Sequence, residues 1–298
     1  MGFLSNLFPT RTQIDRANRN LFFKYKADRL TDLAVHSCEM GVTDEKIAEA
    51  DVIVSLTSYG KRIYDVYLTI ESIMQGTQKP NKIILWLAED EFSSDKIPAT
   101  LKCQIKRGLQ VRFVRELKSY NKLVYSLREF PDSIVVTIDD DMIYNADLLD
   151  RLLVQHRADC SVILSNRVHL MSLNSKGELQ KYEKWKHRKD VGTSRLNFLT
   201  GVGGVLYPPH CFTDEVLNES VFTNICKYAD DVWFNAMAIL SGTLVKKAST
   251  RDKSGNDYIQ NDSVQDVSLR KINNGKNQND VQIEAVFTKY SLYSKLKD

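Results

Sequence analysis

Asp139, Asp140 and Asp141 are three consecutive carboxylates directly after an apolar, β-branched run of six residues (SIVVTI). Such a run predicts a buried strand, and adjacent carboxylates at its end repel one another unless a positive charge neutralises them. In an extended segment, Asp139 and Asp141 project to the same side, about 6 to 7 Å apart. Oxygen ligands favour Mg²⁺ or Mn²⁺, which also bridge phosphate oxygens. The triplet therefore predicts a divalent metal site, with an acidic surface turn as the alternative.

A second acidic pair, Asp230 and Asp231, begins a strongly amphipathic segment that predicts a helix over 228–240. A carboxylate at the start of a helix commonly caps it, and one carboxylate is enough for that role. We expect one of the two to cap the helix. The other is then available to accept a proton or to orient a hydroxyl group.

Basic residues supply the opposite charge. The segment 100–130 contains eight basic and only two acidic residues. Of these, Arg115, Lys118 and Lys122 follow a predicted strand, as Arg62 follows the first one, and this position would let them meet phosphate groups. Each of them alone also fits an ordinary solvated surface.

Alternating strand and helix patterns position these side chains. Buried strands are predicted at 52–56, 82–87, 110–114 and 133–138, separated by helical patterns at 63–75, 97–107 and 121–130. This order predicts an α/β fold with a mostly parallel sheet and helices on both faces, in which ligands bind beyond the carboxyl ends of the strands. No glycine-rich dinucleotide or P-loop pattern follows any of these strands, which disfavours dehydrogenases and P-loop NTPases.

The composition narrows the possible classes of protein further. The 298 residues carry 41 basic and 38 acidic side chains, a net charge of +3, which is no signature of nucleic-acid binding. Five widely spaced cysteines without a C-x-x-C pair indicate a reducing compartment, and we expect a cytoplasmic protein. No apolar run of about 18 residues is present to predict a membrane span.

The chain is predicted to form one domain with additions at its ends. Residues 1–50 are expected to be a helical N-terminal extension, and residues 51–298 the catalytic domain, with 250–298 as a loop-rich tail packing on it. The extension begins with Phe3, Leu4, Leu7 and Phe8 at helical spacing, followed by several basic residues. We expect such a segment to pack on the protein's own body, and peripheral contact with the inner face of the plasma membrane is the alternative.

The acidic triplet is one of a series of landmarks spread over residues 51–245. The others, in chain order, are 57–62 (TSYGKR), 119–122 (SYNK), 200–204 (TGVGG) and 229–231 (ADD). In these segments the chain resembles metal-dependent glycosyltransferases of the GT-A fold, with Asp139 to Asp141 as their DXD motif. It is similar to the family-2-like and exostosin-like enzymes that bacteria use in capsule, lipopolysaccharide or O-antigen assembly.

The resemblance implies a three-layer α/β/α sandwich, a nucleoside diphosphate sugar as donor (expected to be UDP-linked), and a glycan or lipid-linked glycan as acceptor. Mn²⁺ or Mg²⁺ would be held by Asp141 and Asp139, while Asp231 and Asp230 would be the catalytic acids. No histidine follows His210, so the late metal-ligating histidine of some GT-A enzymes is missing. The expected nucleotide-sugar contacts are Thr57, Tyr59, Arg62, Asn121, Lys122, Asp139, Asp140, Gly203 and Gly204.

Two other functions stay open on the sequence. A nucleotidyltransferase that makes a nucleotide sugar would use a similar sheet and metal. A non-catalytic GT-A-like subunit of a polysaccharide assembly complex would keep the fold without the chemistry. The sequence also leaves open the sugar, the linkage, the oligomeric state and whether transfer inverts or retains the anomeric configuration.

Overall fold

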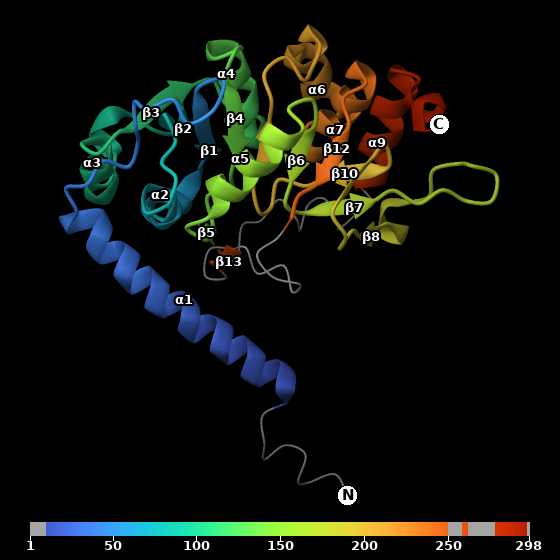
Figure 1. Ribbon diagram of the computed structural model, residues 1–298. Coiled ribbons are helices and arrows are strands. Elements are labelled where there is room, and N and C mark those ends of the chain that lie inside the picture. The colour runs from blue at the N-terminus through green and yellow to red at the C-terminus, as the bar shows by residue number, and fades with distance from the viewer. Residues whose placement is uncertain (1–9, 250–257, 262–277, 297–298) are drawn as a thin grey trace, which may run out of the picture.

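The computed structural model describes residues 10–249, 258–261 and 278–296, and Figure 1 shows their arrangement. Its centre is an eight-stranded sheet in the order β3-β2-β1-β4-β11-β6-β12-β9. Six of these strands run in one direction, and β11 and β9 run opposite. Their bounds are β1 Val52–Thr57, β2 Lys82–Ala88, β3 Leu109–Val114, β4 Ile134–Thr137, β6 Ile163–Ser165, β9 Gly192–Ser194, β11 Val205–Tyr207 and β12 Val245–Lys247.

Helices cover both faces of this sheet. Successive strand residues point to opposite sides, and because the central strands are apolar throughout, both faces must be buried. Val54 and Val136 pack in one core cluster with α2, α3 and α5, whereas Ile53 and Val135 face the side covered by α4 and α7. The predicted α/β fold, a three-layer sandwich around a mostly parallel sheet, is confirmed. The helices are α1 Arg11–His36, α2 Val66–Met74, α3 Ala99–Ile105, α4 Asn121–Glu129, α5 Leu148–Ala158, α6 Glu219–Ile225, α7 Asp230–Ser241 and α9 Gln278–Lys289.

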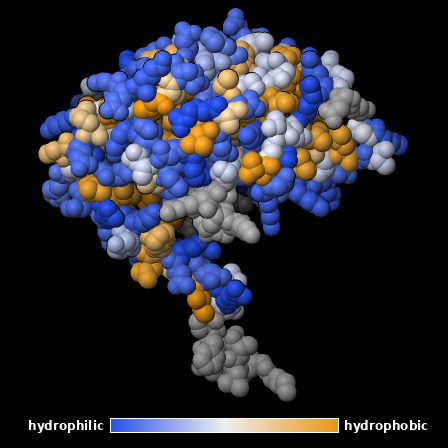
Figure 2. Space-filling model, in the orientation of Figure 1, coloured by the Kyte–Doolittle hydropathy of each residue, from blue (hydrophilic) through white to orange (hydrophobic). Residues whose placement is uncertain are grey.

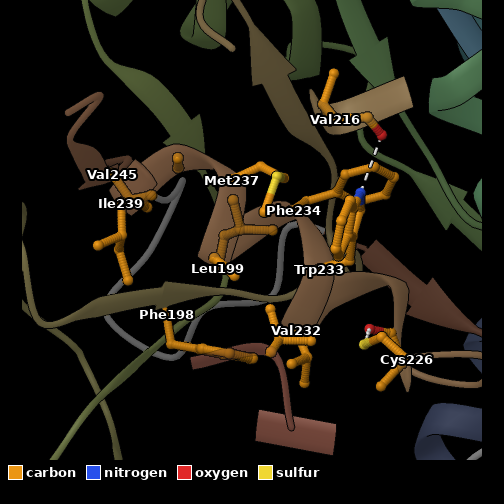
Figure 3. Packing of buried hydrophobic residues seen from close by; sticks show 14 of the residues in the cluster. Phe198, Leu199, Val216, Cys226, Val232, Trp233, Phe234, Met237, Ile239 and Val245 are labelled. Atoms are coloured by element: carbon orange, nitrogen blue, oxygen red, sulfur yellow. Dashed lines mark hydrogen bonds between the residues drawn. The ribbon is translucent and has the colours of Figure 1, made fainter. Parts of the chain in front are cut away.

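Helix α7 lies at the centre of the second core cluster. Every residue from Val232 to Ile239 is buried, and the helix ends at Gly242, whose φ of 75° suits glycine. Figure 3 shows Trp233 beside Phe234 and Met237, with its indole Nε1 donating to the carbonyl of Val216 over 3.0 Å. This packing fixes the first turn of α7 relative to the sheet.

Several short strands depart from the sequence expectation. Strand β11 lies in the glycine-rich stretch 200–207, for which no strand is predicted, and it separates β4 from β6. The polar segment 172–200, for which loops or a hairpin are expected, contains parts of two sheets. Besides β9, it supplies strands to a three-stranded sheet formed by β7 Val168–Leu170, β8 Lys186–His187 and β10 Asn197–Leu199.

The two ends of the chain also differ in part from expectation. Within the predicted helical extension, α1 is helical but residues 37–50 are not. In the described part of the C-terminal tail, Tyr258–Gln260 is a strand, and helices follow within 278–296. They form because Ile283, Val286 and Phe287 give α9 an apolar face, which packs with η7 Leu292–Leu296 against α7. Residues 1–9, 250–257, 262–277 and 297–298 lie outside the described residues, including the apolar N-terminal positions. The domain boundaries stay a prediction.

Across the described ranges, no helix has the length and apolar character that crossing a bilayer requires.

Candidate functional site

The acidic triplet lies at the carboxyl end of β4, as predicted, but in a turn rather than in an extended segment. After β4 the chain turns at Asp140 and Asp141 into β5 Met142–Tyr144, which pairs with β13 Tyr258–Gln260 and not with the main sheet. The backbone N–H of Asp139 donates to the Tyr144 hydroxyl over 3.0 Å. The carbonyl of Asp141 accepts from the Asn261 N–H over 2.8 Å. The expectation of an extended backbone at the triplet is therefore wrong, because β4 ends at Thr137 and the chain turns at Asp140 and Asp141.

Arg62 binds the second and third members of the triplet. It comes from the 3-10 helix η1 Gly60–Tyr64, directly after β1. Its guanidinium lies 2.6 Å from an Asp140 oxygen and 3.3 Å from an Asp141 oxygen, and its carbon Cζ lies 5.1 Å from the centre of the Tyr59 ring. The Ser58 hydroxyl donates to Asp140 over 2.7 Å. Burial raises the pKa of Asp140 even though Arg62 and Ser58 oppose that shift.

Lys122 joins the first member of the triplet to the second acidic pair. It lies in the first turn of α4, and its ammonium nitrogen is 2.9 Å from an Asp139 oxygen and 3.5 Å from an Asp230 oxygen. Burial alone lowers the pKa of Lys122, but the carboxylates of Asp139, Asp230 and Asp231 raise it well above its ordinary value. Lys122 is thus a charged link between two segments about 90 residues apart in the sequence.

The acidic pair on α7 faces this cluster and does not cap its helix. Ala229 is the N-cap and makes no side-chain hydrogen bond there, so the expectation that a carboxylate caps α7 is wrong. One oxygen of Asp231 accepts from the backbone N–H of Gly201 over 3.0 Å. The Asp230 oxygen that lies 3.5 Å from the Lys122 nitrogen is buried and, among the described residues, makes no hydrogen bond. Burial and the neighbouring Asp230 raise the pKa of Asp231 strongly.

The glycines of the loop 200–204 lie in two different surroundings. A Cβ on Gly201 would lie 3.0 Å from the Lys122 nitrogen and 3.4 Å from an Asp139 oxygen, so a side chain at this position would crowd the charged groups. Gly203 and Gly204 have φ angles of 93° and 95° and face Tyr258, Asn166 and Leu148 instead. The structure therefore places Gly201 among the charged groups and the two predicted glycines behind it.

Thr57 and Asn121 lie beside the cluster. The Thr57 hydroxyl donates to the carbonyl of Trp86 over 2.8 Å and is 3.5 Å from the Asn121 amide nitrogen. The Asn121 side-chain oxygen accepts from the N–H of Leu117 over 2.9 Å. Both side chains thus help to hold the carboxyl end of β1 against the start of α4, immediately before Lys122.

The structure brings most of the predicted residues into two linked groups. Arg62 with Asp140 and Asp141 forms one, and Lys122 with Asp139 and the α7 acids forms the other. Sequence reasoning missed the Ser58 hydroxyl, the Tyr144 hydroxyl and the Gly201 N–H, although Ser58 and Gly201 lie inside the landmark segments. In the part of the chain that the structure describes, no three His, Cys, Asp or Glu side chains converge in a way that would hold a metal ion.

Replacing Lys122 by methionine keeps the side-chain length but removes the charge between the carboxylates. Leaving buried charges without their partner typically costs about 3–5 kcal/mol, so we expect a clear fall in melting temperature. The loss should be larger at pH 8 than at pH 5, because Asp231, whose pKa is raised to about 8, is largely neutral at pH 5 and adds its negative charge to the cluster only near pH 8. Thermal unfolding at both pH values checks this, with the exposed Lys176→Met as the matched control. An equal, small effect for both variants would contradict the linking role of Lys122.

The chain is similar to several solved structures of enzymes that bind nucleotides or nucleotide sugars. No family model matches the chain, and no curated protein matches it. Among solved structures, Staphylococcus aureus TarS in complex with UDP is 15% identical, covering 66% of this chain and 57% of its own, with a TM-score of 0.43. The mannosyltransferase PcManGT from Pyrobaculum calidifontis, in complex with GDP-Man and Mn²⁺, is 13% identical over 94% of this chain and 81% of its own, with a TM-score of 0.42.

A third similar structure is CMP:2-keto-3-deoxy-manno-octonic acid synthetase in complex with CTP. It is 12% identical and covers 66% of this chain and 88% of its own, with a TM-score of 0.38. The chain spans 57% of the length of the TarS structures that it matches.

Proposed function

We propose that this protein is a GT-A glycosyltransferase that moves a sugar from a nucleoside diphosphate sugar to a hydroxyl group of a growing glycan. One observation carries the proposal: five landmark segments, spread from Thr57 to Asp231, converge at the carboxyl end of a mostly parallel sheet. There they form one charged cluster through Arg62, Lys122 and Gly201. Ligands of such sheets bind at this edge.

The chemistry of this cluster suits a divalent cation, although no three of its carboxylates converge on one point among the described residues, so phosphate oxygens of the donor would complete the site. Of the five carboxylates, Asp139 to Asp141 with Asp230 and Asp231, four pair with Arg62 or Lys122 within the described ranges, and the buried Asp230 oxygen near Lys122 makes no hydrogen bond there. All of these potential ligands are oxygens, which suits Mn²⁺ or Mg²⁺. Asp141 and Asp139 would hold the ion. When bound, the ion would neutralise charge on the diphosphate leaving group.

The protein's own residues would divide the remaining work between donor and acceptor. On the donor side, Arg62 and Tyr59 would bind the nucleotide, while Lys122 keeps Asp139 positioned beside the α7 acids. On the acceptor side, Gly201 fixes one oxygen of Asp231, and the other oxygen would be available to a hydroxyl group.

In an inverting reaction, the acceptor oxygen forms a bond to the anomeric carbon as the bond from that carbon to the diphosphate breaks. The bonding electron pair leaves with the diphosphate, and the hydroxyl proton passes to Asp231. In a retaining reaction, Asp231 would orient the acceptor instead.

The wider setting is part of the same proposal. The resemblance to capsule, lipopolysaccharide and O-antigen enzymes suggests a glycan or lipid-linked glycan acceptor at the cytoplasmic side of the membrane. A non-catalytic subunit would have no need of this constellation, since Asp230 and Asp231 leave their helix uncapped while pointing into the charged cluster.

A panel of nucleotide sugars tests the proposal at the level of binding. We expect one donor class, UDP-linked in the first instance, to raise the melting temperature in the presence of Mn²⁺ and much less in EDTA. The rise should be smaller for Arg62→Met and unchanged for Lys61→Met, because Lys61 is exposed next to it. If no nucleotide sugar stabilises the protein with either metal, the proposal fails.

A further inference from the structure

Helix α1 has two apolar faces, and the described residues of the protein cover only one of them. Leu30 is buried against Leu68 and Ile143, with Phe23 and Ala27 packed beside it. This covered face begins at Phe23. Every side chain described from position 11 to 22 is exposed. Figure 1 shows this first part of α1 running away from the body, on the side where β5 and β13 lie.

The uncovered face carries a stripe of large apolar side chains. Ile14, Leu21, Phe22 and Tyr25 are 45%, 69%, 52% and 66% exposed. Their spacing places Ile14, Leu21 and Tyr25 opposite Phe23 and Leu30, with Phe22 at the edge of the stripe. Figure 2 shows apolar colour among the polar surface of this projecting part. A capping box between Thr10 and Gln13 begins the helix, so the free segment has a defined start. An isolated helix of this length is only marginally stable in water, so a partner that covers the stripe would stabilise it.

Charge identifies the chemistry of that partner. Residues 11–26, which we name the arm, contain five basic side chains and a single acidic one, Asp15. An apolar stripe containing aromatic residues with basic residues around it is typical of helices that lie in the surface of an anionic bilayer. The basic members of the arm are Arg11, Arg16, Arg19, Lys24 and Lys26.

A second copy of the chain fits the stripe less well. Coiled-coil pairing needs apolar positions sustained over at least three heptads. One heptad beyond Leu21 and Tyr25, the stripe meets Asp28 and Asp32, which are both exposed. The apolar surface therefore ends after about three helical turns.

We propose that the arm docks the protein on the surface of an anionic lipid bilayer. The covered face of α1 links the arm to the functional site, because Ile143 and its strand partner Ile259 pack with this face. Ile143 is two residues after Asp141, so docking brings the carboxyl edge of the sheet toward the bilayer. If the proposed glycosyl transfer is correct, this orientation suits an acceptor glycan carried on a membrane lipid; that last step rests on the proposed function, whereas docking does not.

Vesicle co-sedimentation of the full chain tests the arm. The wild-type protein should sediment with vesicles of phosphatidylcholine and phosphatidylglycerol and much less with phosphatidylcholine alone. Leu21→Ser with Phe22→Ser should weaken binding by at least about tenfold, and Arg19→Glu with Lys24→Glu should do so at low salt. The matched control, Val154→Ser with Val281→Ser, removes two equally exposed apolar side chains elsewhere and should bind like the wild type.

The docking proposal would be overturned by equal binding to both vesicle types, or by equal binding of the Leu21/Phe22 and control variants. It would also be overturned if the protein binds no vesicles and instead forms a dimer that the Leu21/Phe22 variant abolishes. Donor-dependent thermal stabilisation is measured on the same samples. A protein that docks but is stabilised by no donor contradicts only the proposed function. A protein that is stabilised by a donor but does not bind vesicles contradicts only the proposed docking of the arm.

Discussion

Replacing Asp231 by asparagine is expected to slow sugar transfer by roughly a hundredfold to ten-thousandfold, the usual contribution of a general base. Asparagine keeps an oxygen that can accept the hydrogen bond from the Gly201 N–H, so the loop and the start of α7 should stay in place. It cannot take up the acceptor proton. Initial rates of nucleoside diphosphate release, with and without acceptor, measure the effect. The exposed Asp44→Asn serves as control, and a variant at position 231 with wild-type rate would remove Asp231 from the mechanism.

The same substitution should change how stability depends on pH. Burial and the neighbouring Asp230 raise the pKa of Asp231 to about 8, whereas an aspartate in the unfolded chain titrates near 3.9. Between about pH 4 and pH 8, unfolding therefore releases a proton, and the wild-type protein loses stability as the pH rises. Asparagine removes this loss, so the variant's melting temperature in EDTA should exceed that of the wild type by more at pH 8 than at pH 5. A pH-independent difference would contradict the shifted pKa.

The second large effect is expected from Asp139→Asn combined with Asp141→Asn. Turnover should fall by at least about a thousandfold, which corresponds to about 4 kcal/mol of transition-state stabilisation. The fold should survive, because Arg62 keeps Asp140 and Lys122 keeps Asp230 as partners.

The measurements for this double variant are turnover and donor-dependent thermal stabilisation with Mn²⁺ and with EDTA. We expect the Mn²⁺-dependent part of the stabilisation to disappear while the melting temperature of the free protein changes little. The control is Asp44→Asn with Glu45→Gln, an adjacent pair of exposed acids. Full activity of the Asp139/Asp141 variant would contradict the metal assignment.

The first half of the fold could be predicted because its signals are local and strong. The runs at β1, β2 and β4 are short, continuous and apolar, which is how strands buried on both faces read. Strand β11 has only three residues after two glycines with positive φ, so neither its length nor its composition marks it. Helix α9 was missed because its apolar face follows a long polar stretch.

The site could be predicted as a set of residues but not as a set of contacts. The strand pattern placed Asp139 and Lys122 at one edge of the sheet, and the resemblance implied that Asp231 joins them there. Neither predicted that Lys122 would lie between the two acidic segments, because a pairing across about 90 residues depends on how α4 and α7 meet. The turn at Asp140 and the uncapped start of α7 likewise depend on tertiary contacts, those of Arg62 and of the Gly201 N–H.

The identity of the nucleotide that the protein releases tests the central claim most directly. One reaction contains a nucleotide sugar and Mn²⁺, and the other contains a nucleoside triphosphate, a sugar 1-phosphate and Mn²⁺. The proposed glycosyltransferase should release a nucleoside diphosphate in the first reaction, with strong dependence on Asp231, and nothing in the second. Release of pyrophosphate in the second reaction, with no nucleoside diphosphate in the first, would contradict glycosyl transfer and establish a nucleotidyltransferase.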